Sequence, residues 1–478
     1  MESVSRPATT ALPAALPAGR GAVRRILAAA LGLACLLLHA PASAEALRPN
    51  IVFFMVDDLG RERLGIFGGE SHDTPNIDRL AAEGMVFDLS YATPMCSPTR
   101  VMLLSGKYNF RNYTAWGEYR FGTDPTIANT LAAAGYATAV AGKWHLGGWD
   151  APPFGPTRAG FQHYATYNYP EQFDEDLDAT GNFFWNTNLW LGAPGREPRR
   201  LRLGSTYSPA YFRDFAVRFI EEQAGREGPF FLYYPEILVH RPFVPTDLSE
   251  TTGEDHRGRV GDARNFPEMV RYTDDIVGAL LGALERTGQS QDTLFVFTAD
   301  NGTDNVQEAK GMMARWRGRE VLGGKYLPTE LGANVPLVVR WPGKVEAGSR
   351  YRGPVDFTDF HLTFARLAGA EPPEGLDGHD LAPVLTGAGP STRVHAHTWG
   401  VYEYSSRKYK TPQDFPDDIL HVIRDEQWKY VSDGRLYDLS DEPLVEPDEP
   451  LPADAHPEVR RRLAAALEEL RSSGTRLW

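Results

Sequence analysis

Five short apolar runs separated by amphipathic helical patterns restrict the fold of this chain more than any other feature. The runs are Ile51–Val56, Ala137–Ala141, Phe230–Tyr234, Leu294–Thr298 and Pro336–Arg340. The helical patterns are Pro75–Glu83 (after the capping residue Thr74), Thr126–Ala134, Pro209–Glu222, Glu268–Arg286 and Asp359–Ala368. Continuous apolar runs that alternate with helices are typical of parallel strands buried on both faces. We therefore predict an α/β fold in which helices sandwich a large mixed, mostly parallel sheet.

The last hundred residues show a different pattern. A turn-rich stretch at 386–390, Thr-Gly-Ala-Gly-Pro, predicts a boundary. Beyond it, short strands are expected at His421–Ile423, Trp428–Val431 and Arg435–Leu439, with a closing amphipathic helix at Pro457–Arg471. We expect a main domain over 45–390 and a C-terminal subdomain over 391–478, built from a small antiparallel sheet and a terminal helix.

Residues 1–44 have the layout of a secretory signal peptide. Arginines at 20, 24 and 25 precede an apolar stretch, Ile26–Leu38, and Ala42-Ser43-Ala44 forms a small-residue cleavage site. The stretch is too short for a typical membrane span, and lipid modification of Cys35 is the competing interpretation. We expect a secreted or periplasmic product, with no membrane association after cleavage near Ala44.

The charge of the chain limits its partners. The net charge is −14, and residues 1–44 carry four arginines and one glutamate, so cleavage takes it to about −17. An acidic balance argues against nucleic acid and anionic membranes as partners.

Cys96 is the only cysteine of the expected mature chain, in the run Met-Cys-Ser-Pro-Thr-Arg at 95–100. A single thiol in an oxidising compartment has no partner for an internal disulfide. Its presence therefore suggests a chemical rather than an architectural role, although a thiol that is simply buried as a small apolar side chain is the alternative. Pro98 and the apolar residues after it indicate that Cys96 opens a helix, whose dipole favours negative charge there.

Polar side chains follow several of the predicted strands. Asp57-Asp58, Lys143 with His145, His240, and Asp300-Asn301 each come after an apolar run. Ligands bind outside the carboxyl ends of the strands in open α/β sheets, so these groups are expected to converge on one cleft.

These polar groups sort into two chemical sets. The oxygen donors of Asp57, Asp58, Asp300 and Asn301 favour a hard cation such as calcium or magnesium, and no cluster has zinc spacing. The basic set suits a tetrahedral oxyanion, either sulfate or phosphate; its members are Arg100, Lys143, His145, His240 and Lys325.

The chain resembles the type I sulfatases of the alkaline-phosphatase-like superfamily. Cys96-Ser97-Pro98-Thr99-Arg100 matches the family's Cys-x-Pro-x-Arg signature, and Leu104-Ser105-Gly106-Lys107 resembles its companion Leu-Thr-Gly-Arg. The similarity spans residues 48–440, through the segments 57–60, 74–78, 142–147, 298–302, 323–325 and 436–439. Lys107 replaces the usual arginine of the companion motif, and the sequence after Lys325 follows the family pattern only in part.

The resemblance implies a specific catalytic apparatus. Cys96 is expected to be oxidised by a formylglycine-generating enzyme to Cα-formylglycine (3-oxoalanine), whose aldehyde hydrates to a geminal diol that attacks sulfur. One calcium ion would be held by Asp57, Asp58, Asp300 and Asn301 and would touch residue 96. Arg100 and Lys143 would stabilise residue 96, and Lys143, His240 and Lys325 would bind the sulfate.

The family also implies roles in proton transfer. Asp300 would act as base for the attacking hydroxyl, and His240 or Lys325 would assist the leaving alcohol. His145 would then deprotonate the second hydroxyl and expel sulfate. A hemiacetal can collapse in this way, whereas a serine sulfate ester would need a further hydrolysis.

The predicted function is hydrolysis of an aryl or carbohydrate sulfate monoester to an alcohol and inorganic sulfate. Two alternatives stay open: a phosphodiesterase or phosphonate monoester hydrolase of the same superfamily, and a non-catalytic oxyanion-binding protein with unmodified Cys96. Aromatic residues are dense at 108–119 and 161–190 and would either stack on a substrate ring or pack a long insertion. No motif in the sequence identifies the substrate itself.

Overall fold

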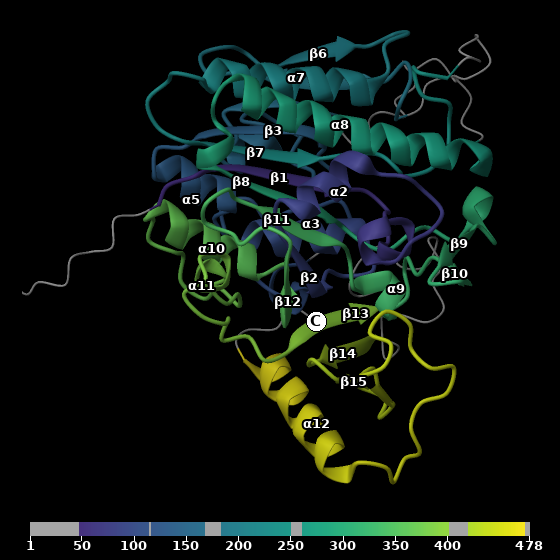
Figure 1. The fold of residues 1–478 in the computed structure, drawn as a ribbon. Coiled ribbons are helices and arrows are strands. Elements are labelled where there is room, and N and C mark those ends of the chain that lie inside the picture. Colours follow the sequence, from purple (N-terminus) through teal and green to yellow (C-terminus); the bar gives the residue numbers. More distant parts are fainter. Residues whose placement is uncertain (1–46, 114–115, 168–182, 250–260, 401–418, 474–478) are drawn as a thin grey trace, which may run out of the picture. The chain divides into compact units, whose positions relative to one another are not determined.

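The computed structural model describes residues 47–113, 116–167, 183–249, 261–400 and 419–473 (Figure 1). The predicted signal segment, 1–44, lies outside the described residues. The description below concerns the compact unit Leu47–Trp478.

The described residues form a ten-stranded main sheet in the order β12-β2-β11-β8-β1-β7-β3-β4-β5-β6. Strand β1 is parallel to both its neighbours, and β3 is parallel to β7 and β4, whereas β11 is antiparallel to β8 and β2. The predicted mixed, mostly parallel sheet is confirmed. The bounds are β1 Asn50–Val56, β2 Met85–Tyr91, β3 Ala137–Lys143, β4 His163–Tyr167, β5 Asn188–Gly192, β6 Arg199–Arg202, β7 Phe230–Pro235, β8 Thr293–Ala299, β11 Leu337–Arg340 and β12 Ser349–Asp356.

Helices cover both faces of this sheet (Figure 1). One group contains α2 (Pro75–Ala82), α7 (Ser208–Gln223) and α8 (Phe266–Arg286), and the other contains α3 (Cys96–Ser105), α5 (Ile127–Ala133) and α10 (Asp359–Ala368). Shorter elements are α4 Asn109–Asn112, α6 Gly155–Arg158, α9 Glu330–Ala333, α11 Ala382–Leu385 and the hairpin β9 Met313–Trp316 with β10 Arg319–Leu322; one-turn 3₁₀ helices are Arg61–Arg63, Gly65–Phe67, Ala263–Asn265, Ser290–Asp292 and Gln307–Ala309.

Strand β1 lies at the centre of the core because every side chain from Ile51 to Val56 is at most 1% exposed. Its neighbouring side chains serve opposite faces, as the pleat requires. Phe53 contacts Phe360 of α10 with ring centroids 4.9 Å apart, and Phe54 stacks on Tyr234 of β7 at 4.9 Å. Burying side chains of this kind contributes roughly 1.5–3 kcal/mol each, so this run anchors the sheet.

Local signals set the helix ends. Thr126 caps α5 by accepting a hydrogen bond from the Asn129 backbone N–H, and the Asn129 side chain accepts from the Thr126 N–H in return. Gly106, with a φ of 68°, ends α3 in the left-handed conformation that glycine adopts without a steric penalty. Helix α3 therefore ends at Ser105, and Cys96 is its first residue, as the sequence indicates.

A second, four-stranded antiparallel sheet follows the main one. Its strands are β13 Ala396–Gly400, β14 Leu420–Arg424, β15 Trp428–Val431 and β16 Leu436–Asp438, and helix α12 (Pro457–Ser472) packs Leu463 and Leu467 against it. The predicted small C-terminal sheet and terminal helix are confirmed. The domain boundary near residue 390 stays a prediction.

None of the described helices is both long enough and apolar enough to cross a bilayer.

Candidate active site

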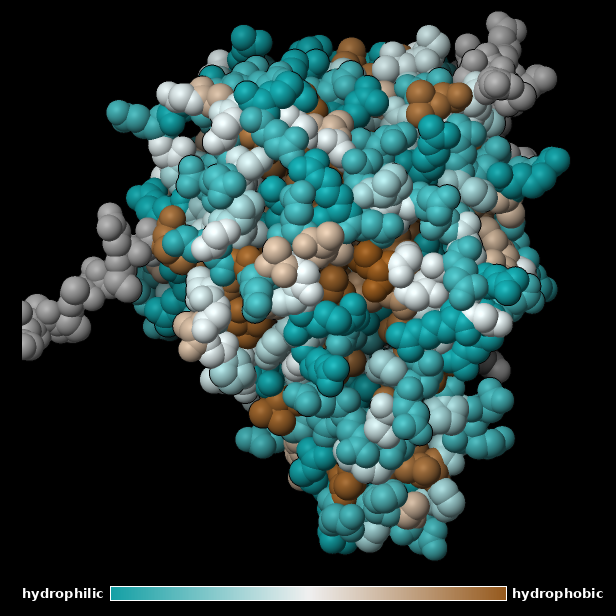
Figure 2. All heavy atoms as spheres, viewed as in Figure 1, coloured by the Kyte–Doolittle hydropathy of each residue, from teal (hydrophilic) through white to brown (hydrophobic). Residues whose placement is uncertain are grey.

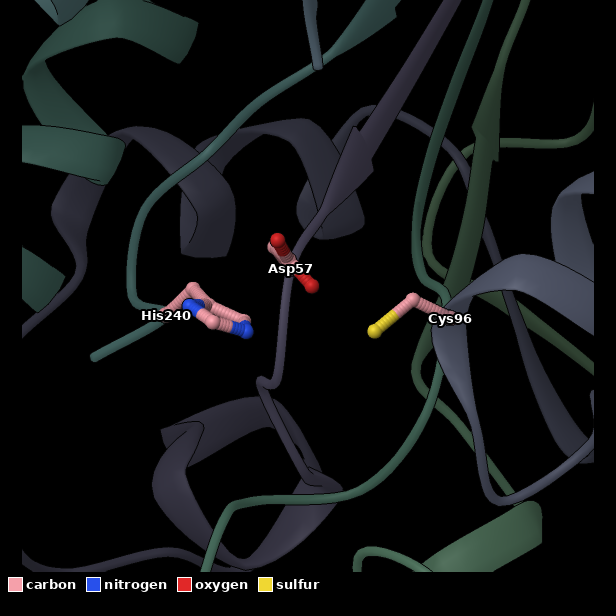
Figure 3. Close-up of side chains that lie close together, drawn as sticks. All are labelled: Asp57, Cys96 and His240. Carbon is pink, nitrogen blue, oxygen red and sulfur yellow. The ribbon is translucent and has the colours of Figure 1, made fainter. Parts of the chain in front are cut away.

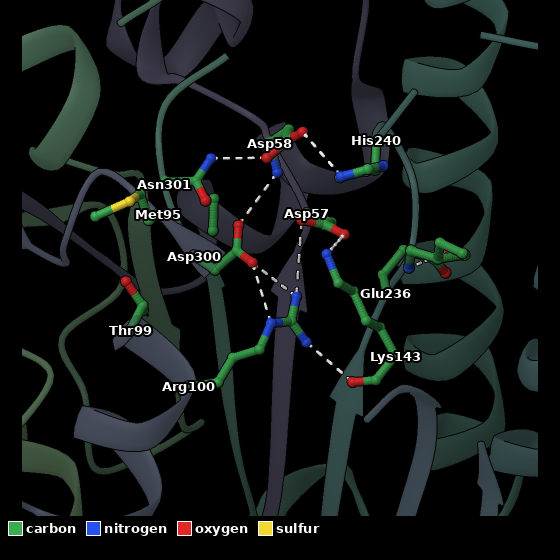
Figure 4. A network of polar contacts seen from close by, with 12 residues as sticks. Asp57, Asp58, Met95, Thr99, Arg100, Lys143, Glu236, His240, Asp300 and Asn301 are labelled. Carbon is green, nitrogen blue, oxygen red and sulfur yellow. Dashed lines mark hydrogen bonds and ion pairs between the residues drawn. The ribbon is translucent and has the colours of Figure 1, made fainter. Parts of the chain in front are cut away.

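The polar residues singled out in the sequence come together at the carboxyl ends of the central strands (Figure 4). Asp57 and Asp58 follow β1, Asp300 and Asn301 follow β8, Lys143 is the last residue of β3, and His240 comes five residues after β7. Cys96 faces this edge from the N-terminus of α3, and Figure 3 shows Asp57 between Cys96 and His240. The residues therefore share one cleft edge, as parallel strands dictate.

The acidic side chains form a compact cluster around the thiol. Ligand atoms of Asp57, Asp58, Cys96 and Asp300 all lie within 4.8 Å of one another, and all four side chains are buried. Asp58 has a φ of 65°, a left-handed conformation that aspartate tolerates better than most residues. This turn lets the Asp58 backbone N–H donate to Asp300 Oδ1 at 3.2 Å, which ties β1 to β8.

Two buried oxygens in this cluster lack a hydrogen-bond partner. They are Asp57 Oδ1 and Asn301 Oδ1, within the part of the chain that the structure describes. Unsatisfied buried acceptors are costly, so each needs an explanation. Carboxylate and amide oxygens that converge without donors have the chemistry that a hard divalent cation requires, and the residues present therefore fit a calcium ion.

Basic side chains enclose the acidic cluster. Arg100 donates from Nη2 to Asp300 Oδ2 at 2.7 Å and from Nη1 to the Lys143 carbonyl at 3.0 Å. Lys143 Nζ donates to Asp57 Oδ2, and Lys325 Nζ donates to Asp58 Oδ2. Three cations thus balance three carboxylates in the cleft. A divalent ion would leave an excess of positive charge, which suits an anionic ester.

Lys325 is the site residue whose position depended most on tertiary structure. It lies 267 residues from Asp58 in sequence, yet its side chain is only 1% exposed and reaches this carboxylate. Gly324 makes the approach possible, because a Cβ at this position would lie 2.4 Å from the Gly332 backbone nitrogen. The structure therefore places Lys325 beside the other predicted residues.

Burial and charge shift the pKa values of two acids in the cluster, Asp300 and Asp58. Burial and the neighbouring Asp57 carboxylate raise the pKa of Asp300 to about 6. Burial alone would raise the pKa of Asp58, but Lys325, His240 and Lys143 outweigh it and hold this pKa below its usual value. The pKa values of two carboxyl groups a few ångströms apart are thus shifted in opposite directions, a pattern common at functional sites.

The two histidines are held in the neutral form. Burial, together with Lys143 and Lys325, lowers the pKa of His240 to about 3, and burial with Lys143 lowers that of His145 well below 6.5. His240 Nδ1 lies 2.5 Å from the Arg241 carbonyl oxygen. Because a carbonyl only accepts, Nδ1 carries the hydrogen, and Nε2, 3.8 Å from Asp58 Oδ2, keeps its lone pair.

The aromatic segments divide between packing in the core and contact with site residues, and stacking on a substrate ring stays a prediction. Tyr108 and Phe110 are buried and pack in the core, whereas Trp116 and Phe183 contact the histidines. The Trp116 ring lies 5.3 Å from that of His145, and Phe183 meets His240 at 5.7 Å. Residues 168–182 of the second segment lie outside the described residues.

Glu236 is a residue of this region that sequence patterns did not reveal. It follows β7, is fully buried, and its Oε1 accepts from the backbone N–H groups of Ile237 at 2.7 Å and Leu238 at 2.9 Å. The same loop is hydrogen-bonded to the backbone of Asp57. The Leu238 carbonyl accepts from the Asp57 N–H at 2.9 Å, and the Val239 N–H donates to the Asp57 carbonyl at 2.8 Å. Glu236 thus fixes the segment that connects Asp57 to His240.

Replacing Glu236 tests this positioning. We expect Glu236→Leu to lower kcat/KM by about ten- to a hundredfold, because small displacements of reacting groups have effects of that size. Glu236→Gln should recover most of the activity, since its amide oxygen still accepts from both N–H groups. Steady-state kinetics on an aryl sulfate, with a melting curve of each variant, give the readout. Equal losses in the two variants would contradict a role that depends on Oε1.

Comparison with known proteins places the chain in a family. A family model described as Sulfatase matches residues 49–370, which include every site residue named above. This chain belongs to the sulfatase family. A second model, described as N-sulphoglucosamine sulphohydrolase, C-terminal, matches residues 325–473 of this sulfatase. The resemblance drawn from the motifs is therefore confirmed.

Individual relatives agree with the assignment of the chain as a sulfatase. The N-acetylgalactosamine-6-sulfatase of Rattus norvegicus is 33% identical over 368 residues, which cover 70% of this chain but 66% of the relative. Arylsulfatase A of Homo sapiens is 32% identical over 416 residues, 78% of this chain and 76% of the relative. The crystal structure of Ps i-CgsB matches with a TM-score of 0.68 and 26% identity, covering 89% of this chain and 92% of the other.

Proposed function

We propose that this sulfatase hydrolyses sulfate monoesters of carbohydrates or phenols to an alcohol and inorganic sulfate. The observation that carries the proposal is the thiol of Cys96, which lies within 4.8 Å of three carboxylates and is enclosed by buried cations. The sulfatase names of the relatives support the same chemistry. Phosphoester or phosphonate hydrolysis and simple oxyanion binding have no comparable support.

Residue 96 supplies the nucleophile in this proposal. Cys96 would be oxidised by a formylglycine-generating enzyme, and the hydrated aldehyde offers one hydroxyl for attack and a second for product release. The unmodified thiol is a poor nucleophile here, because burial raises its pKa well above the usual value. Its place as the first residue of α3 adds the helix dipole to the positive environment.

Asp57, Asp58, Asp300 and Asn301 would hold the calcium ion, which supplies positive charge beside residue 96 and polarises bound oxygens. Lys143 and Lys325, which nearby carboxylates keep charged despite their burial, donate hydrogen bonds to sulfate oxygens. Arg100 keeps Asp300 and the Lys143 backbone in place.

Proton transfer is assigned to the groups whose protonation state suits it. His145, neutral because its pKa is lowered, takes the proton from the second hydroxyl of residue 96. Asp300 accepts the proton of the attacking hydroxyl. Lys325 donates to the leaving oxygen, because the Nε2 atom of neutral His240 carries no hydrogen. Each of these groups lies in the cleft described above.

The substrate and setting are proposed on further grounds. Ps i-CgsB has also been solved with a neocarrahexaose, at 25% identity to this chain, and several relatives bear names of sugar sulfatases. We therefore favour a sulfated glycan over an aryl sulfate. Export through the signal at 1–44, to the periplasm or the medium, would bring the enzyme to such substrates.

A substrate panel tests the proposal. Purified protein with oxidised residue 96 should release sulfate from at least one sulfated sugar or chromogenic aryl sulfate. Rates on matched phosphate diesters and phosphonate esters should be much lower. A dominant diester or phosphonate rate would replace the proposed activity, and no turnover of any ester would favour the oxyanion-binding alternative.

Metal removal gives a second test. Exhaustive chelation should lower kcat/KM by at least about a hundredfold, because the charge that it removes stabilises the transition state. It should also lower the melting temperature, since an ion present at a hundred times its Kd stabilises the fold by about 2.7 kcal/mol. Calcium should restore both, and zinc should not. Full activity after chelation would refute the metal assignment.

A further inference from the structure

A basic cavity lies between helix α7 and the hairpin formed by β5 and β6. Its volume is about 530 Å³. Tyr211, Phe215 and Arg218 face it from α7, at the spacing of three and four residues that places side chains on one helical face. The turn of the hairpin, 193–199, forms the opposite wall. We call this cavity the arginine pocket.

The arginine pocket is separate from the active site. His163 of the pocket begins β4, whereas Tyr167 at the other end of β4 pairs with Lys143. Four residues of strand span about 13 Å. The pocket is thus displaced along the strands from the cleft, and ligands of the two sites need not compete.

Four arginines line the pocket: Arg196, Arg199, Arg218 and Arg226. Within the described part of the chain, no carboxylate lies at ion-pair distance from any of their guanidinium groups, whereas exposed arginines elsewhere, such as Arg79 and Arg264, are paired. Glu197 and Glu222 are the acidic residues of the lining. A local excess of positive charge in a chain of net charge −14 indicates an anionic ligand.

The remaining lining suits a sugar ring. Tyr211 and Phe215 are partly exposed on α7, and Tyr164 and Phe219 are buried beneath them. Aromatic faces give apolar contact area, and arginine forks bind the planar or tetrahedral oxygens of anions in pairs. The surface over α7 and β6, at the top of the view, is otherwise largely hydrophilic (Figure 2).

We propose that the arginine pocket is a second, non-catalytic binding site for sulfated polysaccharide. The inference rests on the proposed function for its choice of sulfate as the anion. A polymer held in the pocket presents its other sulfate groups to the cleft at high effective concentration. The four guanidinium groups bind sulfate oxygens, and the rings of Tyr211 and Phe215 contact the sugars.

The experiment uses short dextran sulfate, with uncharged dextran as the blank, and the full chain carrying Cys96→Ala so that nothing is hydrolysed. Calorimetry should detect two binding sites in this protein. Adding Arg199→Glu and Arg218→Glu should remove one site, or weaken it at least tenfold. A matched control adds Arg264→Glu and Arg286→Glu, two exposed arginines outside the pocket with side chains 90% and 59% exposed. This control makes the same change in net charge and should keep both sites.

Each outcome has a defined meaning. Equal binding by the pocket and control variants overturns the proposal and leaves Arg199 as a charge that protects the edge strand β6 from pairing. The pocket substitutions are also made in the protein that keeps Cys96. These variants should hydrolyse a small aryl sulfate as fast as the unsubstituted protein does, which shows that they fold. A parent that hydrolyses no ester but binds dextran sulfate through the pocket would refute the proposed function and keep this inference.

Discussion

Cys96→Ala is expected to abolish turnover while the protein stays folded. The substitution removes only a sulfur atom from a side chain that is 1% exposed, so the free energy of unfolding should fall by about 1 kcal/mol, the cost typical of a small buried deletion. Activity should be lost entirely, because residue 96 is the proposed nucleophile and lies beside both the carboxylates and the cations. Kinetics on an aryl sulfate and a melting curve give the two readouts.

The parent protein supplies the control for this experiment. Mass analysis of the tryptic peptide containing residue 96 should show a loss of about 18 Da, because the SH group and one hydrogen are replaced by a carbonyl oxygen. An unmodified peptide in a fully active preparation would separate activity from formylglycine. Substantial activity in Cys96→Ala would refute residue 96 as the nucleophile.

Lys143→Ala is expected to have the next largest effect. Its ammonium group is buried in the cleft, where it pairs with Asp57, and its backbone carbonyl accepts from Arg100. Removing one preorganised charge from a desolvated site typically lowers kcat by 10²–10³, or about 3–4 kcal/mol of transition-state stabilisation. We expect most of the loss in kcat, because the charge acts mainly on the developing negative charge.

Lys344→Ala is the matched control, since this lysine is exposed and follows β11, which runs antiparallel to β8 and therefore ends at the sheet edge opposite Asp300. It should leave kcat, KM and the melting temperature unchanged. If Lys143→Ala instead raised KM with kcat intact, Lys143 would bind substrate and transition state equally, and the assignment of electrostatic catalysis would be wrong.

The central sheet was predictable because its strands are continuous apolar runs. The strands β2 and β12 were not predicted, for identifiable reasons. In β2 the run is interrupted by Asp88, which weakens the pattern. In β12, Gly353-Pro354 reads as a turn, but the strand lies at the sheet edge, where its pairing with β2 shifts register between Tyr351 and Pro354. An edge strand tolerates glycine and proline, whereas the sequence pattern predicts that the strand ends there.

The site was predictable to the extent that motifs mark it. Residues next to strand ends, such as Asp57 and Asp300, follow from topology alone. Glu236 and Asp304 were missed because their roles depend on contacts across the fold. Glu236 holds a loop through backbone N–H groups, and Asp304 pairs with Arg241 and lies 3.9 Å from Lys325. No local pattern distinguishes such acids from ordinary loop residues.

The burial of Cys96 would set a time limit on its proposed oxidation. A thiol that is 1% exposed cannot enter the active site of another enzyme, so the proposed oxidation would have to precede folding. The strands and loops that enclose it, from β3 to Lys325, are synthesised later than α3. The nascent chain would therefore offer the proposed maturation enzyme a brief window, and any condition that speeds folding relative to oxidation would yield a stable but permanently inactive product.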